Sequence, residues 1–136
     1  MTISLEILEK EEDLDLLYPL IKKMAKLSKF PFSQLLYEVL MSLRDPNYVT
    51  FLCRDGNEIK GYATGYLYNA EEFYLSQGMK TFSEKNYDLI KTFFDFIETY
   101  LSGKGLKRIL GLSIPPPAVF ERYGFKLQRY LISKDI

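Results

Sequence analysis

The chain has 136 residues, of which 47% are hydrophobic and 26% are charged, as expected for one globular domain with a sizeable core. Its 18 Lys and Arg residues balance its 18 Asp and Glu residues, and this zero net charge argues against nucleic acid or an acidic membrane as a partner. With no histidine and a single cysteine, the sequence excludes an internal disulfide, histidine-dependent triads and histidine-rich metal sites. We expect no bound metal.

The N-terminal residues contain no basic start followed by a long apolar run, and no later run approaches the length of a membrane span. Repeats, low-complexity tracts and linkers are also missing from the sequence. We therefore predict a soluble, cytoplasmic protein that forms a single domain over residues 1–136.

The first third of the chain predicts one strand and two helices. Residues 3–7 alternate apolar and polar side chains, which is typical of a half-buried strand. Apolar residues at spacings of three and four then predict a helix over 14–27, in which Pro19 either starts the regular part or kinks it. Ser33 is a candidate N-cap for a second helix that ends before Pro46.

The middle of the chain predicts a three-stranded meander. Residues 48–54 and 58–68 are strand-like and flank the turn sequence Asp55-Gly56-Asn57, which is a hairpin signal, and residues 72–81 supply the third strand. Cys53 shares a strand face with apolar residues, so we interpret it as a core residue and not as a nucleophile.

The last third predicts a long helix, two strands and a brief helix between them. Helical periodicity around residues 89–101 stops at the glycines of 102–105. Residues 108–113 return as a strand, and three prolines then force an extended bend before a brief helix that ends at Tyr123. Residues 125–133 read as one final strand.

The segment Ala118-Val119-Phe120-Glu121-Arg122-Tyr123-Gly124-Phe125-Lys126 resembles the closing segment of the GNAT superfamily of acyl-CoA-dependent N-acyltransferases. The hairpin over 51–63 is similar to the second and third strands of that family, including a glycine early in the third strand. The resemblance implies an α+β fold with a mixed central sheet flanked by helices, in the order β-α-α-β-β-β-α-β-α-β.

The resemblance also implies acetyl-CoA as a co-substrate. In the family, a Gln/Arg-x-x-Gly-x-Gly/Ala loop holds the pyrophosphate on backbone amides at a helix N-terminus. Alignment places Lys85 at the Gln/Arg position, Asp88 at the first glycine and Ile90 at the second. We expect the cofactor to contact residues of the fourth strand and of this loop: Met79, Lys80, Thr81, Lys85, Asn86, Tyr87, Asp88 and Leu89. Asp88 favours helix capping but would repel a diphosphate.

The resemblance assigns the catalytic residues less directly than it assigns the cofactor-binding residues. Phe120 stands where many family members have a tyrosine acid, so Tyr123, one helical turn away, is the candidate proton donor to the thiolate. The alternative is that Tyr123 packs beneath the last strand. Glu72, beside Glu71, is the candidate relay for the proton of the amine, and the alternative is that both glutamates are simply solvated.

Tyr62, Tyr66 and Tyr68 share one face of the predicted third strand. They line a substrate groove, pack against the helices, or form a contact in a homodimer. For the whole chain, the resemblance implies an N-acetyltransferase that acts on an amine of a small molecule or a protein. The alternatives are a non-catalytic GNAT-like binding or dimerisation module that has lost acyl-CoA binding, and a different α+β domain with a ligand-binding meander.

Overall fold

The computed structural model describes residues 2–81, 86–112, 122–124, 126–128 and 131–136. These residues form two compact units, Met1–Gly65 with Gln77–Ser83 and Tyr66–Ser76 with Glu84–Ile136. The order of the paired strands is β1-β2-β3-β4-β5-β7-β6, and β3 and β4 each contribute residues to both units. Among the described residues, no helix is long and apolar enough to cross a membrane.

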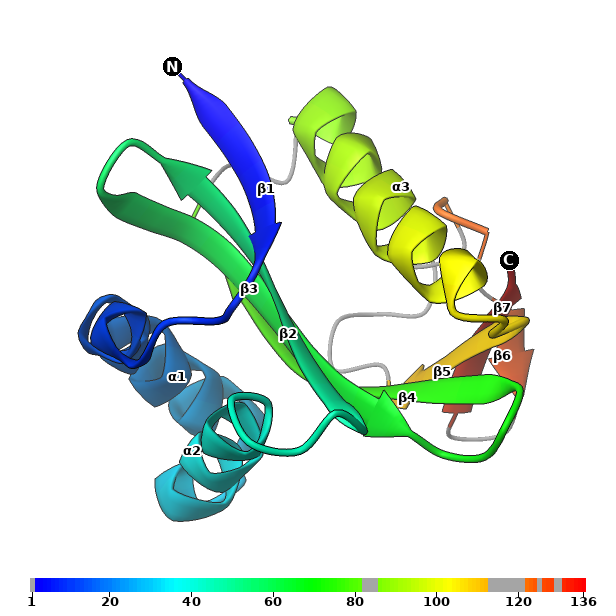
Figure 1. The fold of residues 1–136 in the computed structure, drawn as a ribbon, viewed down its shortest axis with the longest axis horizontal. Helices are drawn as coiled ribbons and strands as arrows, with labels where there is room; N and C mark the ends of the chain where they lie inside the picture. Colours follow the sequence, from blue (N-terminus) through cyan, green and yellow to red (C-terminus); the bar gives the residue numbers. More distant parts are fainter. Residues whose placement is uncertain (1, 82–85, 113–121, 125, 129–130) are drawn as a thin grey trace. The chain divides into compact units, whose positions relative to one another are not determined.

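The first unit combines the N-terminal strands with two helices (Figure 1). Its elements are β1 (Ile3–Ile7), the 3-10 helix η1 (Glu11–Asp13), α1 (Leu14–Ser28), α2 (Phe32–Met41), β2 (Tyr48–Asp55) and most of β3 (Glu58–Leu67). Strand β1 pairs antiparallel with β2, so that Leu5 lies opposite Cys53. Buried side chains of α1 and α2 form one core cluster with Leu52, Ile59 and Tyr62 of the strands.

The second unit contains the start of β4 (Glu72–Lys80), α3 (Tyr87–Gly103), β5 (Arg108–Leu112), β6 (Lys126–Gln128) and β7 (Leu131–Asp135). Strands β4 and β5 are parallel, from Glu72 opposite Arg108 to Leu75 opposite Gly111, and β7 is antiparallel to both β5 and β6. Helix α3 buries an apolar stripe at spacings of three and four, as its sequence predicts: Ile90, Phe93, Ile97 and Leu101.

Two local expectations are wrong. The predicted final strand is instead a hairpin of two antiparallel strands, β6 and β7. The sequence between Lys126 and Ser133 contains no glycine, proline, asparagine or aspartate to mark a turn, so its pattern predicts one strand. Helix α2 is preceded by Pro31 as N-cap, and Ser33 lies inside the helix. Pro19 lies inside α1, which excludes it as the first residue of the helix and leaves the expected kink a prediction. Most of the predicted brief helix lies outside the described residues, and the three residues Arg122 to Gly124 form a turn.

Cys53 is confirmed as a core residue, because its side chain is fully buried. Burial, followed by the negative charge of Asp55, raises the pKa of the Cys53 thiol. Both effects disfavour the thiolate, which is the reactive form of cysteine.

Strand β4 has one residue more than β3 between their hydrogen-bonded ends. At the hairpin end, the Tyr68 N–H donates to the Glu72 carbonyl (2.9 Å), and at the far end the Thr81 N–H donates to the Lys60 carbonyl (2.8 Å). The stretch from Glu72 to Thr81 is one residue longer than the stretch from Lys60 to Tyr68. An extra residue in one strand of an antiparallel pair is a β-bulge.

Side-chain contacts place this bulge in the middle of β4. The rings of Tyr66 and Tyr74 meet at 5.4 Å, and the Tyr62 hydroxyl donates to Gln77 Oε1 at 2.7 Å. Tyr62 and Tyr66 are an even number of residues apart and share a face of β3, whereas Tyr74 and Gln77 are three residues apart. Tyr74 and Gln77 can both contact the same face of β3 only if the extra residue lies between them. The extra residue reverses the face to which every later β4 side chain points.

Candidate functional site

The N-terminus of α3 is capped by Asn86, one of the residues predicted to contact the cofactor. Asn86 Oδ1 accepts a hydrogen bond from the Leu89 N–H (3.3 Å), and the Asn86 carbonyl accepts from the Ile90 N–H (3.1 Å). Tyr87 and Asp88 are both exposed in the first helical turn, where amides have no acceptor within the helix. Within the helix, the amides of Tyr87 and Asp88 therefore have no acceptor, whereas the Leu89 amide donates to the Asn86 cap.

Arg122 brings a positive charge to this first turn. Its guanidinium carbon lies 4.6 Å from the centre of the Tyr87 ring, which is a cation–π distance. The sequence prediction did not include Arg122, because the two residues are 35 positions apart and a single sequence carries no signal for that contact. Together, Arg122 and the positive end of the helix dipole oppose the negative charge of Asp88.

Tyr123, the candidate proton donor, lies one residue further along the same turn. Its half-buried ring packs against Phe94 of α3, with ring centres 5.2 Å apart and planes at 31°. Phe94 follows Tyr87 by seven residues, which is about two helical turns, so both aromatic rings lie on one side of α3. The turn of residues 122–124 thus places the predicted acid beside the helix whose N-terminus is the predicted pyrophosphate site.

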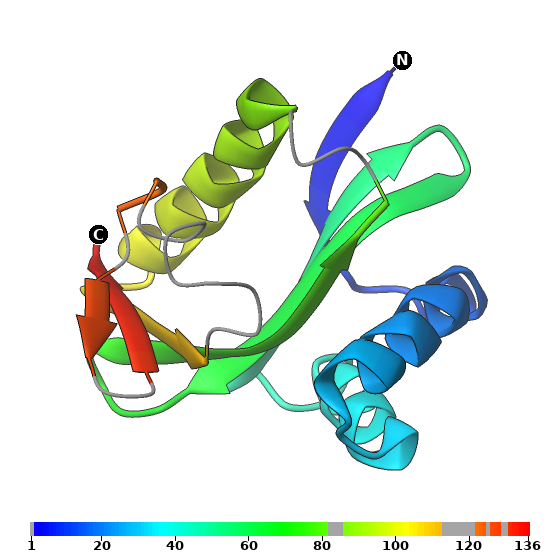
Figure 2. The same ribbon diagram turned by 180° about the vertical axis from the view of Figure 1, so that it is seen from behind.

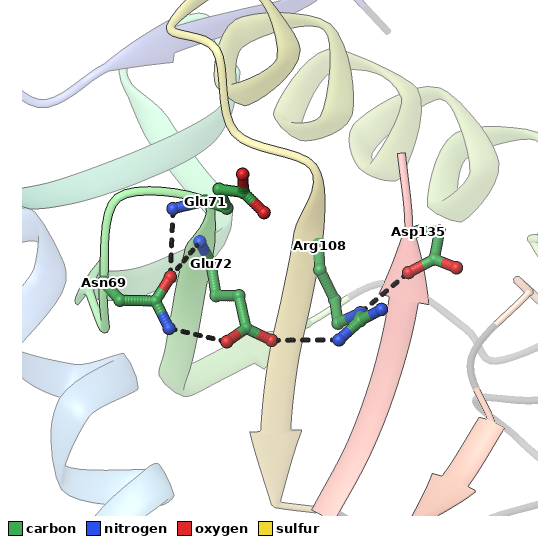
Figure 3. Close-up of polar contacts among 5 residues, drawn as sticks. All are labelled: Asn69, Glu71, Glu72, Arg108 and Asp135. Atoms are coloured by element: carbon green, nitrogen blue, oxygen red, sulfur yellow. Dashed lines mark hydrogen bonds and ion pairs between the residues drawn. The ribbon is translucent and has the colours of Figure 1, made fainter.

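Glu72, the candidate proton relay, lies in a different polar cluster at the start of β4 (Figure 3). Its Oε1 accepts from Asn69 Nδ2 (2.6 Å), and its Oε2 accepts from Arg108 Nη1 (3.2 Å). Arg108 Nε also donates to Asp135 Oδ1 (2.7 Å), so the guanidinium links β4 to β7 through β5. The hydrogen bond and the negative charge of Asp135, followed by the hydrogen bond to Glu72, raise the pKa of Arg108 above its ordinary value.

The Glu72 cluster borders an open hollow of about 410 Å³. Its lining is almost entirely charged: Glu71, Glu72, Lys107, Arg108 and Asp135, with Ile136. These charges pair with one another, since Lys107 Nζ also lies 3.5 Å from Glu71 Oε1. Both Glu72 oxygens already accept hydrogen bonds here, an arrangement that fixes the carboxylate and ties β4 to its neighbours.

Met79 and Lys80 form the end of β4 opposite to Glu72, and Thr81 follows directly after the strand. Met79 packs against the apolar core of the first unit. The Thr81 N–H and hydroxyl both donate to the Lys60 carbonyl, at 2.8 and 3.2 Å, so this amide is already engaged in the sheet. Lys85 lies outside the described residues.

The structure thus places Asn86, Tyr87, Asp88 and Leu89 at the N-terminus of α3 and places Tyr123 against Phe94, about two turns further along the same helix. Glu72 lies in a separate cluster. The roles of all these residues remain predictions. Within the described part of the chain, no three His, Cys, Asp or Glu side chains are arranged to hold a metal ion.

No family model matches the sequence, and no curated protein sequence matches it. Solved structures do match over the whole chain. The PaiA N-acetyltransferase from Thermoplasma acidophilum in complex with coenzyme A matches with a TM-score of 0.79 and 15% identity over 100% of both chains. The aminoglycoside 6'-acetyltransferase type Ii matches with a TM-score of 0.77 and 15% identity over 99% of this chain and 97% of its own.

A GNAT family acetyltransferase from Elizabethkingia anophelis with acetyl-CoA bound also matches, with a TM-score of 0.70 and 12% identity over 98% of both chains. All three likenesses extend over nearly the full length of this chain and of its counterpart. The chain therefore has the α+β fold of the GNAT acetyltransferases.

Proposed function

We propose that this protein is an acyl-CoA-dependent N-acyltransferase whose acceptor is an amine of a small molecule or a protein. In this reaction the neutral amine attacks the thioester carbonyl, a C–N bond forms, the C–S bond breaks, and the thiolate takes up a proton. The observation that carries the proposal is the likeness over the full length of both chains to a coenzyme A complex. The cluster of Arg122 and Tyr123 along α3 supports it.

In the proposed complex, the diphosphate of acyl-CoA binds at the first turn of α3. The amides of Tyr87 and Asp88 and the guanidinium of Arg122 are the donors that fit an anion there. The Asp88 carboxylate opposes them, so we expect binding weaker than a glycine-rich loop would give. Backbone amides tolerate side-chain substitution, which is why the altered loop sequence does not by itself remove this site.

Tyr123 is the proposed donor of a proton to the leaving thiolate. A phenol is the only acid that the turn of residues 122–124 offers, and packing on Phe94 restricts its ring. For Glu72, we propose the weaker role of a proton relay. Its two hydrogen-bonded oxygens make it a less available base than a water molecule or a free carboxylate would be.

Isothermal titration with acetyl-CoA and with coenzyme A tests the proposal. We expect micromolar binding by the wild-type protein, weaker binding by Arg122→Met and tighter binding by Asp88→Asn. A hydrogen bond between charged groups contributes about 1.5–3 kcal/mol, so Arg122→Met should weaken binding by about 10- to 100-fold. Arg122→Met preserves the apolar contact with the Tyr87 ring.

Lys104→Met is the matched control. Lys104 Nζ lies 5.6 Å from the centre of the Tyr100 ring at the other end of the same helix, so this change removes an equivalent cation–π contact away from the proposed site. It should leave coenzyme A affinity unchanged. Equal losses in both variants, or no binding by the wild-type protein at any concentration, would contradict the proposed diphosphate site.

A non-catalytic module with the GNAT fold is the second candidate function. The observation that favours it is the Asn86 cap, which occupies the Leu89 amide at the helix end where a diphosphate would bind. This candidate predicts no coenzyme A binding by the wild-type protein, and no release of free thiol from acetyl-CoA with any amine.

A further inference from the structure

One exposed face of α1 divides into an acidic half and a basic half. Exposed side chains follow it at spacings of three and four, beginning in η1 with Glu12 and continuing through Asp15, Pro19, Lys23 and Lys26. Lys22 and Lys29 add further exposed positive charge at the C-terminal end. Acidic side chains therefore lie in η1 and at the start of α1, and lysines lie in the second half of α1 and just after it.

No charged side chain of this face has an ion-pair partner among the described residues. This holds for Glu12, Asp15, Lys23 and Lys26 alike. Elsewhere in the chain, Lys91, Lys107 and Lys134 each pair with a carboxylate. The α1 face is thus a set of opposite charges that the described part of its own chain leaves uncompensated.

Exposed apolar side chains accompany these charges. Leu16 and Leu27 are 41% and 61% exposed, and they are 11 residues apart, which is about three helical turns, so they lie on the same side of α1. Phe30, just beyond the helix, is 45% exposed. Figure 2 shows α1 from the side opposite to Figure 1, next to α2, against which its buried residues pack.

We propose that this face binds the same face of a second copy of the chain, with the two α1 helices antiparallel about a two-fold axis near Pro19. In that arrangement Glu12 and Asp15 of each copy lie opposite Lys23 and Lys26 of the other. Leu16 and Leu27 of both copies lie along one edge of the contact. A two-fold interface must be complementary to itself, and a helix with one acidic and one basic half meets that condition.

The charge pattern favours a second copy over other occupants. An anionic membrane or a polyanion would gain from the lysines but would be repelled by Glu12 and Asp15. A contact through one helix from each copy is at the small end of specific protein interfaces. We therefore expect a weak dimer, with a dissociation constant on the order of 10–100 µM, that dissociates at high salt.

Sedimentation equilibrium of the full chain, over about 1–300 µM at low salt, tests the proposal with two double variants. Lys23→Glu with Lys26→Glu makes all four charges of the proposed contact acidic, and Glu12→Lys with Asp15→Lys makes all four basic. Each should weaken self-association by at least about tenfold. An equimolar mixture of the two should form a heterodimer, because both ends of the antiparallel contact are then complementary again.

Lys91→Glu with Lys104→Glu is the control for net charge, since it changes the net charge by the same amount on α3 and at its C-cap. It should dimerise like the wild-type protein. A monomeric wild type at the highest concentration would overturn the proposal, as would a wholly acidic variant that still dimerises, or a mixture of the two variants that fails to associate. Binding of monomers to anionic vesicles would identify a membrane as the occupant instead.

Discussion

Lys134 lies across Gly124 so closely that a Cβ atom on residue 124 would stand 2.9 Å from Lys134 Cε. Gly124 has a φ of +90°, in the region that favours glycine. Lys134 is held in place because its ammonium lies 2.8 Å from Glu98 Oε1 on α3, in a half-buried ion pair. The glycine of the Tyr-Gly-Phe sequence is thus explained by packing beneath a tethered lysine, as well as by backbone conformation.

Gly124→Ala should lower the free energy of unfolding by about 1–3 kcal/mol, since it adds steric crowding to backbone strain. Gly105→Ala is the control, because Gly105 has a φ of +86° but no atom within 4 Å of its Cβ position. Gly105→Ala should lower the free energy of unfolding by a smaller amount, because it adds backbone strain without crowding. Urea denaturation measures both. If the costs are equal, the contact with Lys134 contributes nothing.

The buried side chain of Gln77 connects β4 to both β3 and α2. Its Oε1 accepts from the Tyr62 hydroxyl, and its Nε2 donates to the Leu35 carbonyl and to Glu38 Oε1, both at 2.9 Å. Gln77→Leu removes all three of these hydrogen bonds from a buried position and should destabilise the protein by about 2–4 kcal/mol. Tyr62→Phe leaves only one acceptor, Gln77 Oε1, without its donor and should lower the free energy of unfolding by about 1–2 kcal/mol.

A double-mutant cycle in urea separates these two effects. Because Tyr62 and Gln77 share one hydrogen bond, Gln77→Leu with Tyr62→Phe should cost less than the sum of the single changes. Strict additivity would show that the bond does not contribute to stability.

The sequence predicts the elements that repeat a pattern and misses those that depend on contacts distant in sequence. Alternating residues locate β1 to β4, and the apolar stripes locate α1 and α3, so the α+β class and most of the element order are confirmed. The β4 bulge is invisible in the sequence, because it is defined only by comparison with β3. For the same reason a polar Gln77 in a strand gives no sign of its burial.

The candidate site is less predictable than the fold. Helix capping by Asn86 follows from local sequence rules, since asparagine is a favoured N-cap. Neither the position of Arg122 over Tyr87 nor the pairing of Glu72 with Arg108 follows from any local rule. Both contacts depend on how the second unit folds, which a single sequence does not encode in a readable pattern.

Alkaline pH should destabilise the protein through two buried groups. Burial, followed by the charge of Glu38, raises the pKa of the Tyr62 phenol above 10.0, and burial with Asp55 raises the pKa of the Cys53 thiol above 9.0. The unfolded chain therefore loses these protons at a lower pH than the folded chain does. Stability is retained below about pH 9 and falls as the pH rises further, by up to about 1.4 kcal/mol per pH unit for each group.

Urea denaturation between about pH 8 and 11 measures this dependence. Tyr62→Phe with Cys53→Ala should be less stable at pH 8 but should show a smaller fall at high pH. A fall as steep as in the wild-type protein would assign the effect to other groups. In the native protein at pH 8, Cys53 should also resist alkylation by iodoacetamide and react only after unfolding.

Asn86→Gly should have opposite effects on stability and on coenzyme A binding. Asn86 Oδ1 occupies the Leu89 amide, so its removal frees a third amide in the first turn of α3. Glycine is itself a tolerated N-cap and should cost only a few tenths of a kcal/mol, whereas Asn86→Ala should cost about 1 kcal/mol. If the diphosphate binds at this helix end, both variants should bind coenzyme A more tightly than the wild-type protein, because the freed amide adds a donor. Calorimetric titration paired with urea denaturation measures the two effects. Unchanged affinity in both variants would indicate that the anion does not bind at the N-terminus of α3. Weaker affinity would indicate that the side-chain amide of Asn86 itself contacts the anion.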